Sequence, residues 1–555
     1  MCDCNILCKI VCAIIIVVAF VVNTIGGWFG SSGDIIPTEK CLFGCECHTT
    51  TVEETTQTDL PSDDSTVPSS VTEPTTESTT ESTTESTTES TTESTTESTT
   101  ESTTTTAKRY ETTTEPETDA GPYVTDVAFD SLSVFGGSDD DIINGISPTA
   151  DGGYVVCGTT YSKDGNFESL QTGAKWQVPY SFVTCYTSTG TVKWTKVFAS
   201  TSNSVTLKDV AVLSDGTIAA VGYSAATEYQ AGKESEGSID AFIIRLSKTG
   251  FLRTTKNFGG ENSDLFYCIA ATENGYVVGG KTYSSKGDFE GLSGQNAIII
   301  NFSNNNTVNW KKYLSGNGSS GIEGITCDDN GNIFATCLTT STTGDFSVFE
   351  NLYGGYTDTV VLKYKNDGTY EWGFPVSSSG RDCFSAVTPD GKGGCVVAGY
   401  YELIPNPFPD GTLSDVHNYG AIDSLIIRIK PNGTRRWIKS ISGFDNDIIT
   451  DITAVNGGFA ASGYSTSSNY TFAAAGNEGE NDGFVVFLNT NGIGVNLFTQ
   501  AGMSDDIANC VTATSNGCVV AAGKTKSTTV DFENLNTYSN AAYLAYTARY
   551  SYTIS

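Results

Sequence analysis

A pattern of short apolar runs and small-residue turns recurs seven times in the last three quarters of the chain. Each copy joins a turn rich in Asp, Asn and Gly to an apolar run, and the copies end at residues 158, 222, 280, 337, 399, 463 and 523. A glycine closes every copy except the fourth, which has Cys337. The spacing is about 60 residues, which is typical of a structural unit that buries its apolar face only by stacking on its neighbours.

Each repeat reads as four short strands. In the third repeat the pattern predicts strands over residues 265–271, 276–280, 297–302 and 308–314, with turn residues between them. The third run is continuously apolar, so we expect it to be buried on both faces. Four antiparallel strands in each of seven repeats predict an all-β fold, a seven-bladed β-propeller over residues 123–555.

The two ends of this region predict how the ring closes. The last repeat stops after its third strand, and an unmatched strand-like segment, residues 129–135, precedes the first repeat. That segment aligns with the fourth strands predicted at 192–198 and 252–258. We therefore expect the N-terminal strand to complete blade seven, which would remove a free sheet edge.

Several motifs resemble a known group of repeats. The chain has Gly-Gly-Ser-Asp-Asp-Asp at 136–141, Asp-Gly-Gly-Tyr-Val-Val at 151–156 and Gly-x-x-x-Trp at 190–194. These motifs look like the roughly 60-residue propeller repeats of microbial surface proteins and lipoproteins, akin to delta-60-type repeats. The resemblance implies a propeller in an extracellular setting, and it implies no single activity.

Charge narrows the choice of partners. The 555 residues include 64 acidic and 30 basic ones, a net charge of −34. This charge argues against nucleic acid as a partner, because its phosphates would be repelled, and against a polybasic membrane-surface role. We therefore expect no nucleic acid partner.

The N-terminal quarter differs in composition from the repeats. Residues 6–22 are strongly apolar, which predicts a membrane helix within a signal-anchor over residues 1–30. A cleaved signal peptide is the alternative. A cysteine-containing juxtamembrane segment, residues 31–47, follows. We expect a single-pass protein with its C-terminal ectodomain outside the cell, or a secreted protein if the segment is cleaved.

Residues 48–122 predict a disordered stalk. Glutamate recurs every fourth residue from Glu77 to Glu101 within a Ser/Thr-rich, mucin-like tract. Such a tract lacks the apolar residues that a core requires and is typical of an O-glycosylated spacer. An unmodified linker is the alternative.

Polar residues that recur around the ring are interpreted first as scaffold. One set precedes the first strand of a repeat: Asp141, Asp264, Asp382, Asp447 and Asp506. A second set opens the third strand: Asp240, Asp358, Asp423 and Asp482, with Asn296 and Asn540 expected at the same position. A carboxylate can accept backbone N–H groups at a tight turn. A tryptophan recurs in the fourth strand, which predicts inter-blade packing: Trp194, Trp310, Trp372 and Trp437.

The loops between second and third strands are long and differ between repeats, so they are the predicted ligand-binding region. They carry the candidate ligand contacts Trp176, Tyr180, Tyr229, Phe408, His417, Tyr419, Tyr470 and Phe472. Aromatic rings beside acids and amides suit a glycan or a surface protein. The alternative is that these loops only cover the blades.

The leading hypothesis is a surface binding or adhesion module. A propeller-based glycan-active enzyme and a structural coat protein are the alternatives. No catalytic residue is assigned, because the repeats hold no nucleophile elbow and only one histidine. No cofactor is predicted, and calcium at the acidic loops 139–141 or 477–482 is a further alternative. The nine cysteines of the repeats could be buried thiols or could form bridges within hairpins.

Overall fold

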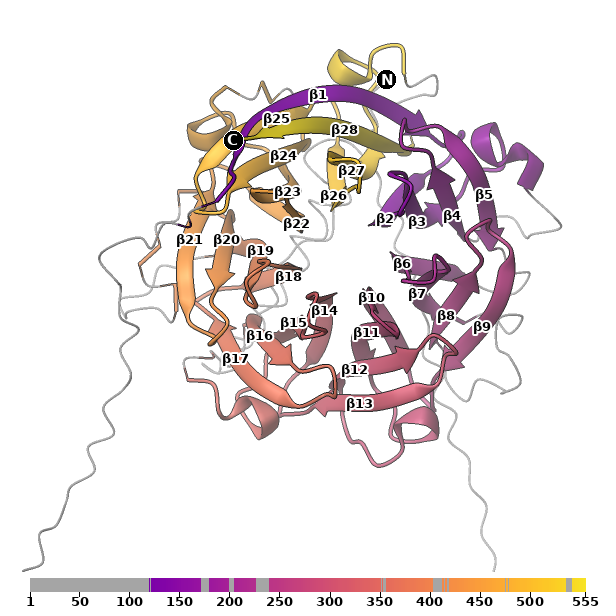
Figure 1. The fold of residues 1–555 in the computed structure, drawn as a ribbon, viewed down its shortest axis with the longest axis vertical. Helices are drawn as coiled ribbons and strands as arrows, with labels where there is room; N and C mark the ends of the chain where they lie inside the picture. The colour runs from indigo at the N-terminus through magenta and orange to yellow at the C-terminus, as the bar shows by residue number, and fades with distance from the viewer. Residues whose placement is uncertain are drawn as a thin grey trace, which may run out of the picture. The chain divides into compact units, whose positions relative to one another are not determined.

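The structure of the repeat region is a closed ring of blades. The computed structural model describes residue 119 and residues 121–555, apart from 171–178, 199–203, 226–238, 351, 353–355, 403–411, 414, 417–418, 475, 478 and 536–541. Within these residues, seven four-stranded antiparallel sheets surround a common centre (Figure 1). The predicted seven-bladed propeller is confirmed. The predicted signal-anchor and cysteine segment, and the stalk except for residues 119, 121 and 122, lie outside the described residues.

The blades follow one another along the chain, each running from an inner to an outer strand. Blades 1 to 4 consist of β2 (Asp141–Pro148), β3 (Tyr154–Thr160), β4 (Tyr180–Tyr186) and β5 (Val192–Phe198); β6 (Val205–Val212), β7 (Ile218–Ser224), β8 (Asp240–Leu246) and β9 (Leu252–Phe258); β10 (Asp264–Thr272), β11 (Gly275–Thr282), β12 (Asn296–Ser303) and β13 (Val308–Leu314); and β14 (Ser320–Cys327), β15 (Ile333–Thr339), β16 (Asp358–Tyr364) and β17 (Tyr370–Val376).

The remaining blades keep the same order. Blades 5 to 7 consist of β18 (Asp382–Pro389), β19 (Cys395–Tyr401), β20 (Asp423–Ile429) and β21 (Arg435–Ile441); β22 (Asp447–Val455), β23 (Gly458–Ser465), β24 (Asp482–Asn489) and β25 (Gly494–Gln500); and β26 (Asp506–Ala513), β27 (Cys518–Thr525), β28 (Leu544–Ile554) and β1 (Val124–Phe135). Short 3-10 turns lie in the loops of five blades: η1 (Gly165–Leu170), η3 (Gly287–Phe289), η4 (Gly344–Phe346), η5 (Tyr470–Phe472) and η6 (Val530–Phe532). Among the described residues, no helix is both long enough and apolar enough to cross a membrane.

The N-terminal strand closes the ring, as predicted. β1 pairs antiparallel with β28 and forms the outer strand of blade 7, where Figure 1 shows the two ends of the colour scale side by side. The strand begins at Val124, five residues before the predicted start, because pairing continues to Ile554 at the end of β28. Tyr123 and Ser555 exchange two further backbone hydrogen bonds of 3.0 Å. β28, the last strand of the chain, therefore has a paired strand on both sides.

The core lies between neighbouring blades rather than within one blade. The third strand of blades 1 to 6 is almost entirely buried, as the continuous apolar run of β12 predicted. One buried cluster joins Val221 and Ile243 of blade 2 to Phe266, Val278 and Ile300 of blade 3. A single blade would expose one of these faces to water, so the apolar surface is hidden only in the stacked ring.

The tryptophans of the fourth strands hold adjacent blades together. In blades 3, 4 and 5 each indole N–H donates to a carbonyl in the last turn of the next blade: Trp310 to Asn366 (2.9 Å), Trp372 to Pro431 (2.8 Å) and Trp437 to Thr490 (3.2 Å). A glycine of that turn lies against the ring. At Gly433, which has φ +81°, a Cβ would come within 2.9 Å of Trp372. The turn therefore requires glycine for both its backbone conformation and the contact.

The nine cysteines of the repeats are all free thiols. Strand register shows why the pairs within hairpins are not bridged. Cys510 is opposite Ala522, and Cys518 is opposite Ser551 on the other neighbouring strand. Burial raises the pKa of Cys510, so this thiol is stabilised in its neutral form.

Candidate functional site

Strand direction places the two kinds of connection on opposite faces of the propeller. The connections that lead into each inner strand and the long loops between second and third strands lie on one face, which we call the loop face. The short turns that follow the inner strands and the third strands lie on the other, which we call the turn face. This arrangement follows from alternating antiparallel order in every blade.

A repeated clasp ties the long loops to the loop face. In five blades the residue after the first position of the 3-10 turn donates its N–H to a carbonyl that ends the preceding fourth strand or follows it. The pairs are Asn166 to Gly136, Asp288 to Gly259, Asp345 to Ser315, Thr471 to Ser442 and Asp531 to Ala501, at 2.9 to 3.2 Å. The next residue is a buried phenylalanine in every case: Phe167, Phe289, Phe346, Phe472 and Phe532. Each of these loops is therefore held to its blade by a backbone hydrogen bond and by a buried phenylalanine, which we call the plug of the clasp.

The recurrent aspartates are buried at the loop-face end of the inner strands. Asp141, Asp264, Asp382, Asp447 and Asp506 are all fully buried. Four of them accept the N–H of the residue four positions earlier: Gly137 to Asp141, Gly260 to Asp264, Ser378 to Asp382 and Gly443 to Asp447. Serine hydroxyls just after the second strand add further bonds, such as Ser284 to Asp264 at 2.9 Å and Ser527 to Asp506 at 2.8 Å. Their contacts are with the protein's own turns.

These aspartates face the first residue of the third strand in the preceding blade. The facing pairs are Asp240 and Asp264, Asp358 and Asp382, Asp423 and Asp447, and Asp482 and Asp506. In each pair the N–H of the second aspartate donates to the carbonyl of the residue before the first, at 2.6 to 2.9 Å. Between blades 3 and 4 both members are neutral, Asn296 and Ser320. In the last repeat, Leu544 takes the register that Asn296 takes in the third, because it pairs with Thr525 as Asn296 pairs with Thr282. The expected placement of Asn540 at this position is therefore wrong, and residue 540 itself lies outside the described residues.

Burial changes the acidity of these carboxyls. It raises the pKa of Asp141 and Asp506 to about 7 and that of Asp264 and Asp447 to about 6. Burial, together with the charge of Asp358, also raises the pKa of Asp382. The charge of the facing aspartate adds to the rise in pKa of Asp382, Asp447 and Asp506, so these three pairs favour holding a proton.

The predicted ligand contacts separate into three groups. Trp176, Tyr229, Phe408 and His417 lie outside the described residues. Tyr180 and Phe472 are buried, each with 1% of its surface exposed, so the expectation that they contact a ligand is corrected. Tyr180 begins a buried third strand, and Phe472 is the plug of a clasp. Tyr419 and Tyr470 are exposed on the loop face and lie together.

Tyr419 and Tyr470 form an aromatic cluster with Phe444, which the sequence analysis did not single out. The ring of Tyr470 lies 4.7 Å from that of Tyr419 and 4.8 Å from that of Phe444, measured between centroids. Their exposed fractions are 45% for Tyr419, 57% for Phe444 and 54% for Tyr470. We call these three residues the aromatic platform. It joins the long loops of blades 5 and 6 to the connection between them.

Comparison with the other repeats could have identified the platform. Phe444 occupies the position of Ser138, Glu261 and Asn317, which are polar. Tyr470 occupies the first position of the 3-10 turn, where blades 1, 3 and 4 have glycine with φ between +58° and +65°. Tyr470 itself has φ +48°. The next blade repeats both changes, with exposed Met503 and with Val530 at φ +55°.

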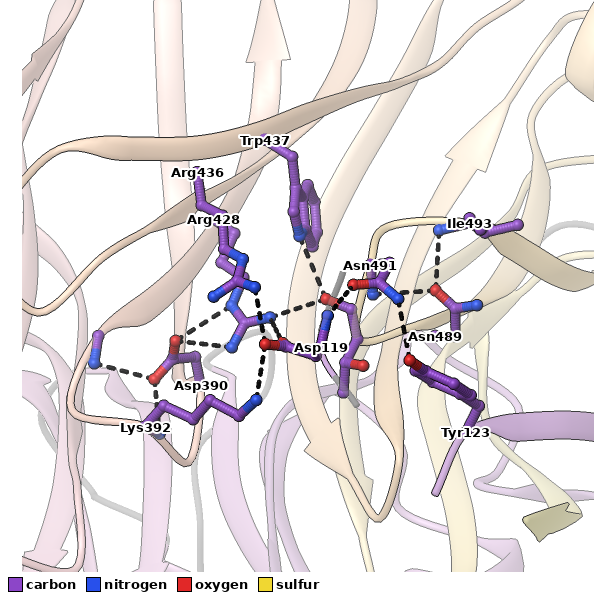
Figure 2. Close-up of polar contacts among 12 residues, drawn as sticks. Asp119, Tyr123, Asp390, Lys392, Arg428, Arg436, Trp437, Asn489, Asn491 and Ile493 are labelled. Atoms are coloured by element: carbon purple, nitrogen blue, oxygen red, sulfur yellow. Dashed lines mark hydrogen bonds and ion pairs between the residues drawn. The ribbon is translucent and has the colours of Figure 1, made fainter. Parts of the chain in front are cut away.

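The chain enters the propeller on the turn face. Figure 2 shows three cations converging on Asp119, and we call this contact the entry clamp. Asp119 accepts Arg436 Nη2 and Lys392 Nζ, each at 2.7 Å, and Arg428 Nη1 at 2.5 Å. Its N–H donates to Asn491 Oδ1 at 2.8 Å. Burial alone would raise the pKa of Asp119, but hydrogen bonds from Lys392 and Arg428 hold it below its ordinary value.

The clamp also bridges two blades. Lys392 lies in the turn between β18 and β19 of blade 5, and Asn491 lies in the turn between β24 and β25 of blade 6. The fully buried Arg428 reaches Asp390 at 2.9 Å as well as Asp119. The segment that precedes β1 is therefore held against blades 5 and 6, in addition to the pairing of β1 in blade 7.

No group of three or more His, Cys, Asp or Glu in the described part of the chain comes together as a set of metal ligands. Asp139 and Asp140, in one proposed calcium loop, make hydrogen bonds within the fold. The N–H of Asp139 donates to Ser162 Oγ at 3.0 Å, and Asp140 Oδ1 accepts the N–H of Tyr543 at 2.9 Å.

Comparisons with known proteins match the fold and leave the activity open. No family model matches the chain, and no curated protein matches it. Among solved structures, BamB from Moraxella catarrhalis matches at 12% identity, covering 78% of this chain and 99% of that chain, with a TM-score of 0.35. Virginiamycin B lyase from Staphylococcus aureus matches at 10% identity, covering 76% and 99%, with a TM-score of 0.39. A Dyadobacter fermentans protein of unknown function matches at 12% identity, covering 77% and 99%, with a TM-score of 0.40. Similarity at this level supports no functional argument, and the likeness to delta-60-type repeats rests on sequence motifs alone.

Proposed function

We propose that this protein is a cell-surface binding module that recognises a glycan through the aromatic platform on its loop face. The observation that carries the proposal is the exposed cluster of Tyr419, Phe444 and Tyr470. Three large rings in mutual contact and open to water form an apolar patch that a folded domain has no internal reason to keep.

The scaffold does not need these side chains. Blade 1 builds the same clasp with Ser138 and Gly165 in the corresponding positions, and its backbone bond from Asn166 to Gly136 (2.9 Å) is shorter than the equivalent bond of blade 6 (3.2 Å). Tyr470 also carries a positive φ, which disfavours a residue with a Cβ by about 1 kcal/mol or more. A strained, exposed aromatic residue where glycine suffices supports a role in binding.

The chemistry around the platform suits a sugar. The rings offer apolar faces for the C–H side of a pyranose, and the exposed side chains of Asp445 and Asn446, next to Phe444, offer hydrogen-bonding groups for hydroxyls. The net charge of −34 disfavours a polyanionic ligand. We therefore propose a neutral or cationic glycan.

The proposed setting rests on the N-terminal quarter of the sequence. The apolar run at residues 6–22 and the Ser/Thr/Glu tract at 48–122 support a membrane anchor followed by a spacer. The entry clamp at Asp119 lies on the turn face, so the chain arrives on the side away from the aromatic platform. A module that is held from the turn face leaves its loop face available to a ligand.

The test is binding of the full-length chain to a glycan array, followed by affinity measurement on the best neutral glycan. The two informative variants are Phe444→Ser and Tyr470→Gly, because each introduces the residue that blade 1 has at that position. The control is Phe251→Ser, which removes a ring that is 70% exposed from a turn-face position.

We expect each platform variant to weaken binding at least tenfold and the control to bind like the wild type. If the wild-type chain binds no glycan on the array, the proposed function is wrong. If it binds but Phe444→Ser and Tyr470→Gly have no effect, the binding role stands and the platform is not the site.

A further inference from the structure

The centre of the propeller contains a channel lined by the same position of every inner strand. This position is the fourth residue, and the seven residues are Asn144, Lys208, Tyr267, Glu323, Ser385, Thr450 and Asn509. The channel has a volume of about 350 Å³. In each blade the pairing with the second strand shifts register across this residue, so it occupies a β-bulge that directs its side chain away from the regular ladder. Because this position occurs once in each blade, the residue in one blade can be compared with its equivalents in the other six.

Three consecutive blades use the position to hold the ring together. Asn509 Nδ2 of blade 7 donates to the carbonyl of Ile143 in blade 1 at 2.8 Å, and Asn144 Nδ2 of blade 1 donates to the carbonyl of Leu207 in blade 2 at 2.8 Å. Thr450 of blade 6 makes the same bond to Ala508 of blade 7. A short polar side chain therefore satisfies the structural requirement at this position.

Blades 2, 3 and 4 carry larger side chains at this position. They place Lys208, Tyr267 and Glu323 in the channel, and within the described part of the chain none of these side chains makes the bond to the next inner strand. The three residues are neighbours around the ring. Two bring opposite charges, and the third brings a phenol between them.

Neither charge is neutralised by direct contact. In the described residues Lys208 and Glu323 form no ion pair, although both lie in the channel wall. Burial raises the pKa of Glu323, and the charges of Lys281 and Lys208 act against that rise from a distance. The Lys281 ammonium lies 5.3 Å from the centre of the Tyr267 ring and shares a hydrogen bond with the Tyr267 hydroxyl. Charges in a partly buried site are normally paired, so this arrangement can accept partners from outside.

We propose that the wall of blades 2, 3 and 4 binds a small zwitterion, a molecule that carries both a carboxylate and an ammonium group. The carboxylate pairs with Lys208 and the ammonium pairs with Glu323, while Tyr267, held by its hydrogen bond to Lys281, forms the wall of the blade between them. The channel volume is at the lower end of the range found for small-molecule sites. The site is separate from the aromatic platform of blades 5 and 6, so the two can be tested independently.

The first test uses the full-length wild-type chain and isothermal titration calorimetry. The probes are glycine, 4-aminobutanoate and 6-aminohexanoate, which differ in the separation of their two charges. Each is compared with its amide, which lacks the carboxylate, and with its N-acetyl derivative, which lacks the ammonium group. We expect at least one zwitterion to bind and both of its blocked derivatives to bind at least tenfold more weakly. If none of the three binds, or if blocking either charge has no effect, the proposal is wrong.

The second test locates the site. Lys208→Asn and Glu323→Asn each introduce the residue that blades 1 and 7 carry at this position, and Ser385→Asn does the same in a blade outside the proposed wall. We expect the first two variants to weaken binding of the zwitterion at least tenfold and the third to leave it unchanged. In Lys208→Asn, the zwitterion and its amide should bind equally, because the partner of the carboxylate is gone. Wild-type affinity in both wall variants would overturn the assignment.

Discussion

Replacing Asp482 and Asp506 should change how the stability of the propeller depends on pH. These two buried carboxyls face each other between blades 6 and 7, at the starts of β24 and β26. Burial raises the pKa of Asp506 to about 7, and the charge of Asp482 adds to that rise, while hydroxyls of Thr525 and Ser527 oppose it. In the unfolded chain the same carboxyl has a pKa near about 4.

The sign follows from the raised value. A carboxyl that holds its proton more tightly in the folded state stabilises the fold fully below its unfolded pKa, and this contribution is lost as pH rises through the folded pKa. Between about pH 5 and pH 6.5 the folded state binds about one more proton at this pair than the unfolded state. The free energy of unfolding should therefore fall by about 1.4 kcal/mol for each pH unit from this pair alone.

The variant Asp482→Asn with Asp506→Ser gives this interface the residues that blades 3 and 4 use, Asn296 and Ser320. Urea unfolding of the full-length chain at about pH 5, 6 and 7 measures the slope. We expect the free energy of unfolding of the wild type to decrease across this range, and that of the variant to decrease by about 1.4 kcal/mol less per pH unit. Part of the slope should remain, because burial also raises the pKa of Asp141, Asp264 and Asp447.

The reverse substitution is the control. Asn296→Asp with Ser320→Asp would build a fifth facing pair and should make the slope steeper. Carboxyls with a lowered pKa do not interfere, because hydrogen bonds hold the pKa of Asp151 and Glu261 near about 2, below the measured range. A wild-type stability that rises with pH over this range, or a variant slope equal to that of the wild type, would refute the reasoning.

Three further predictions concern stability and are checked by urea unfolding of the full-length chain. Phe472→Ala should lower the free energy of unfolding by about 3 to 5 kcal/mol, because it removes the buried phenylalanine of a clasp. Tyr470→Gly should leave the free energy of unfolding unchanged or raise it slightly, because glycine adopts the positive φ of this position without strain. Equal losses in the two variants would contradict the assigned roles. Gly433→Ala should lower the free energy of unfolding by about 1 to 3 kcal/mol, because the turn has φ +81° and the new Cβ would meet Trp372; a neutral result would mean that the turn adapts. Asp119→Ala should lower the free energy of unfolding by about 1 to 3 kcal/mol, because Arg428 stays buried with one partner fewer. Wild-type stability in this variant would show that the entry clamp does not stabilise the fold.

The sequence determined the architecture because each blade of a propeller corresponds to one repeat of the chain. A blade cannot hide its own apolar faces, so every repeat must carry the same buried third strand, and the runs at 297–302 and 308–314 reappear as the cores of β12 and β13. The missing fourth strand of the last repeat and the extra strand at 129–135 were likewise sufficient to predict closure of the ring. Strand length was less well defined, because β1 extends to wherever β28 offers a partner.

The candidate site depended on what the tertiary structure brings together. Sequence could select aromatic residues in long loops, but being in a long loop does not separate the buried Tyr180 from the exposed Tyr419 and Tyr470. For Phe472 the signal was the phenylalanine that recurs at the same position in five blades. Phe444 lies in a different connection and joins the platform because blades 5 and 6 are adjacent in space. The channel wall of Lys208, Tyr267 and Glu323 arises in the same way, since residues separated by about 60 positions become neighbours only when the ring closes. The sequence therefore determines the strands and turns of each repeat, whereas the stacking of the sheets decides which side chains from different blades come into contact.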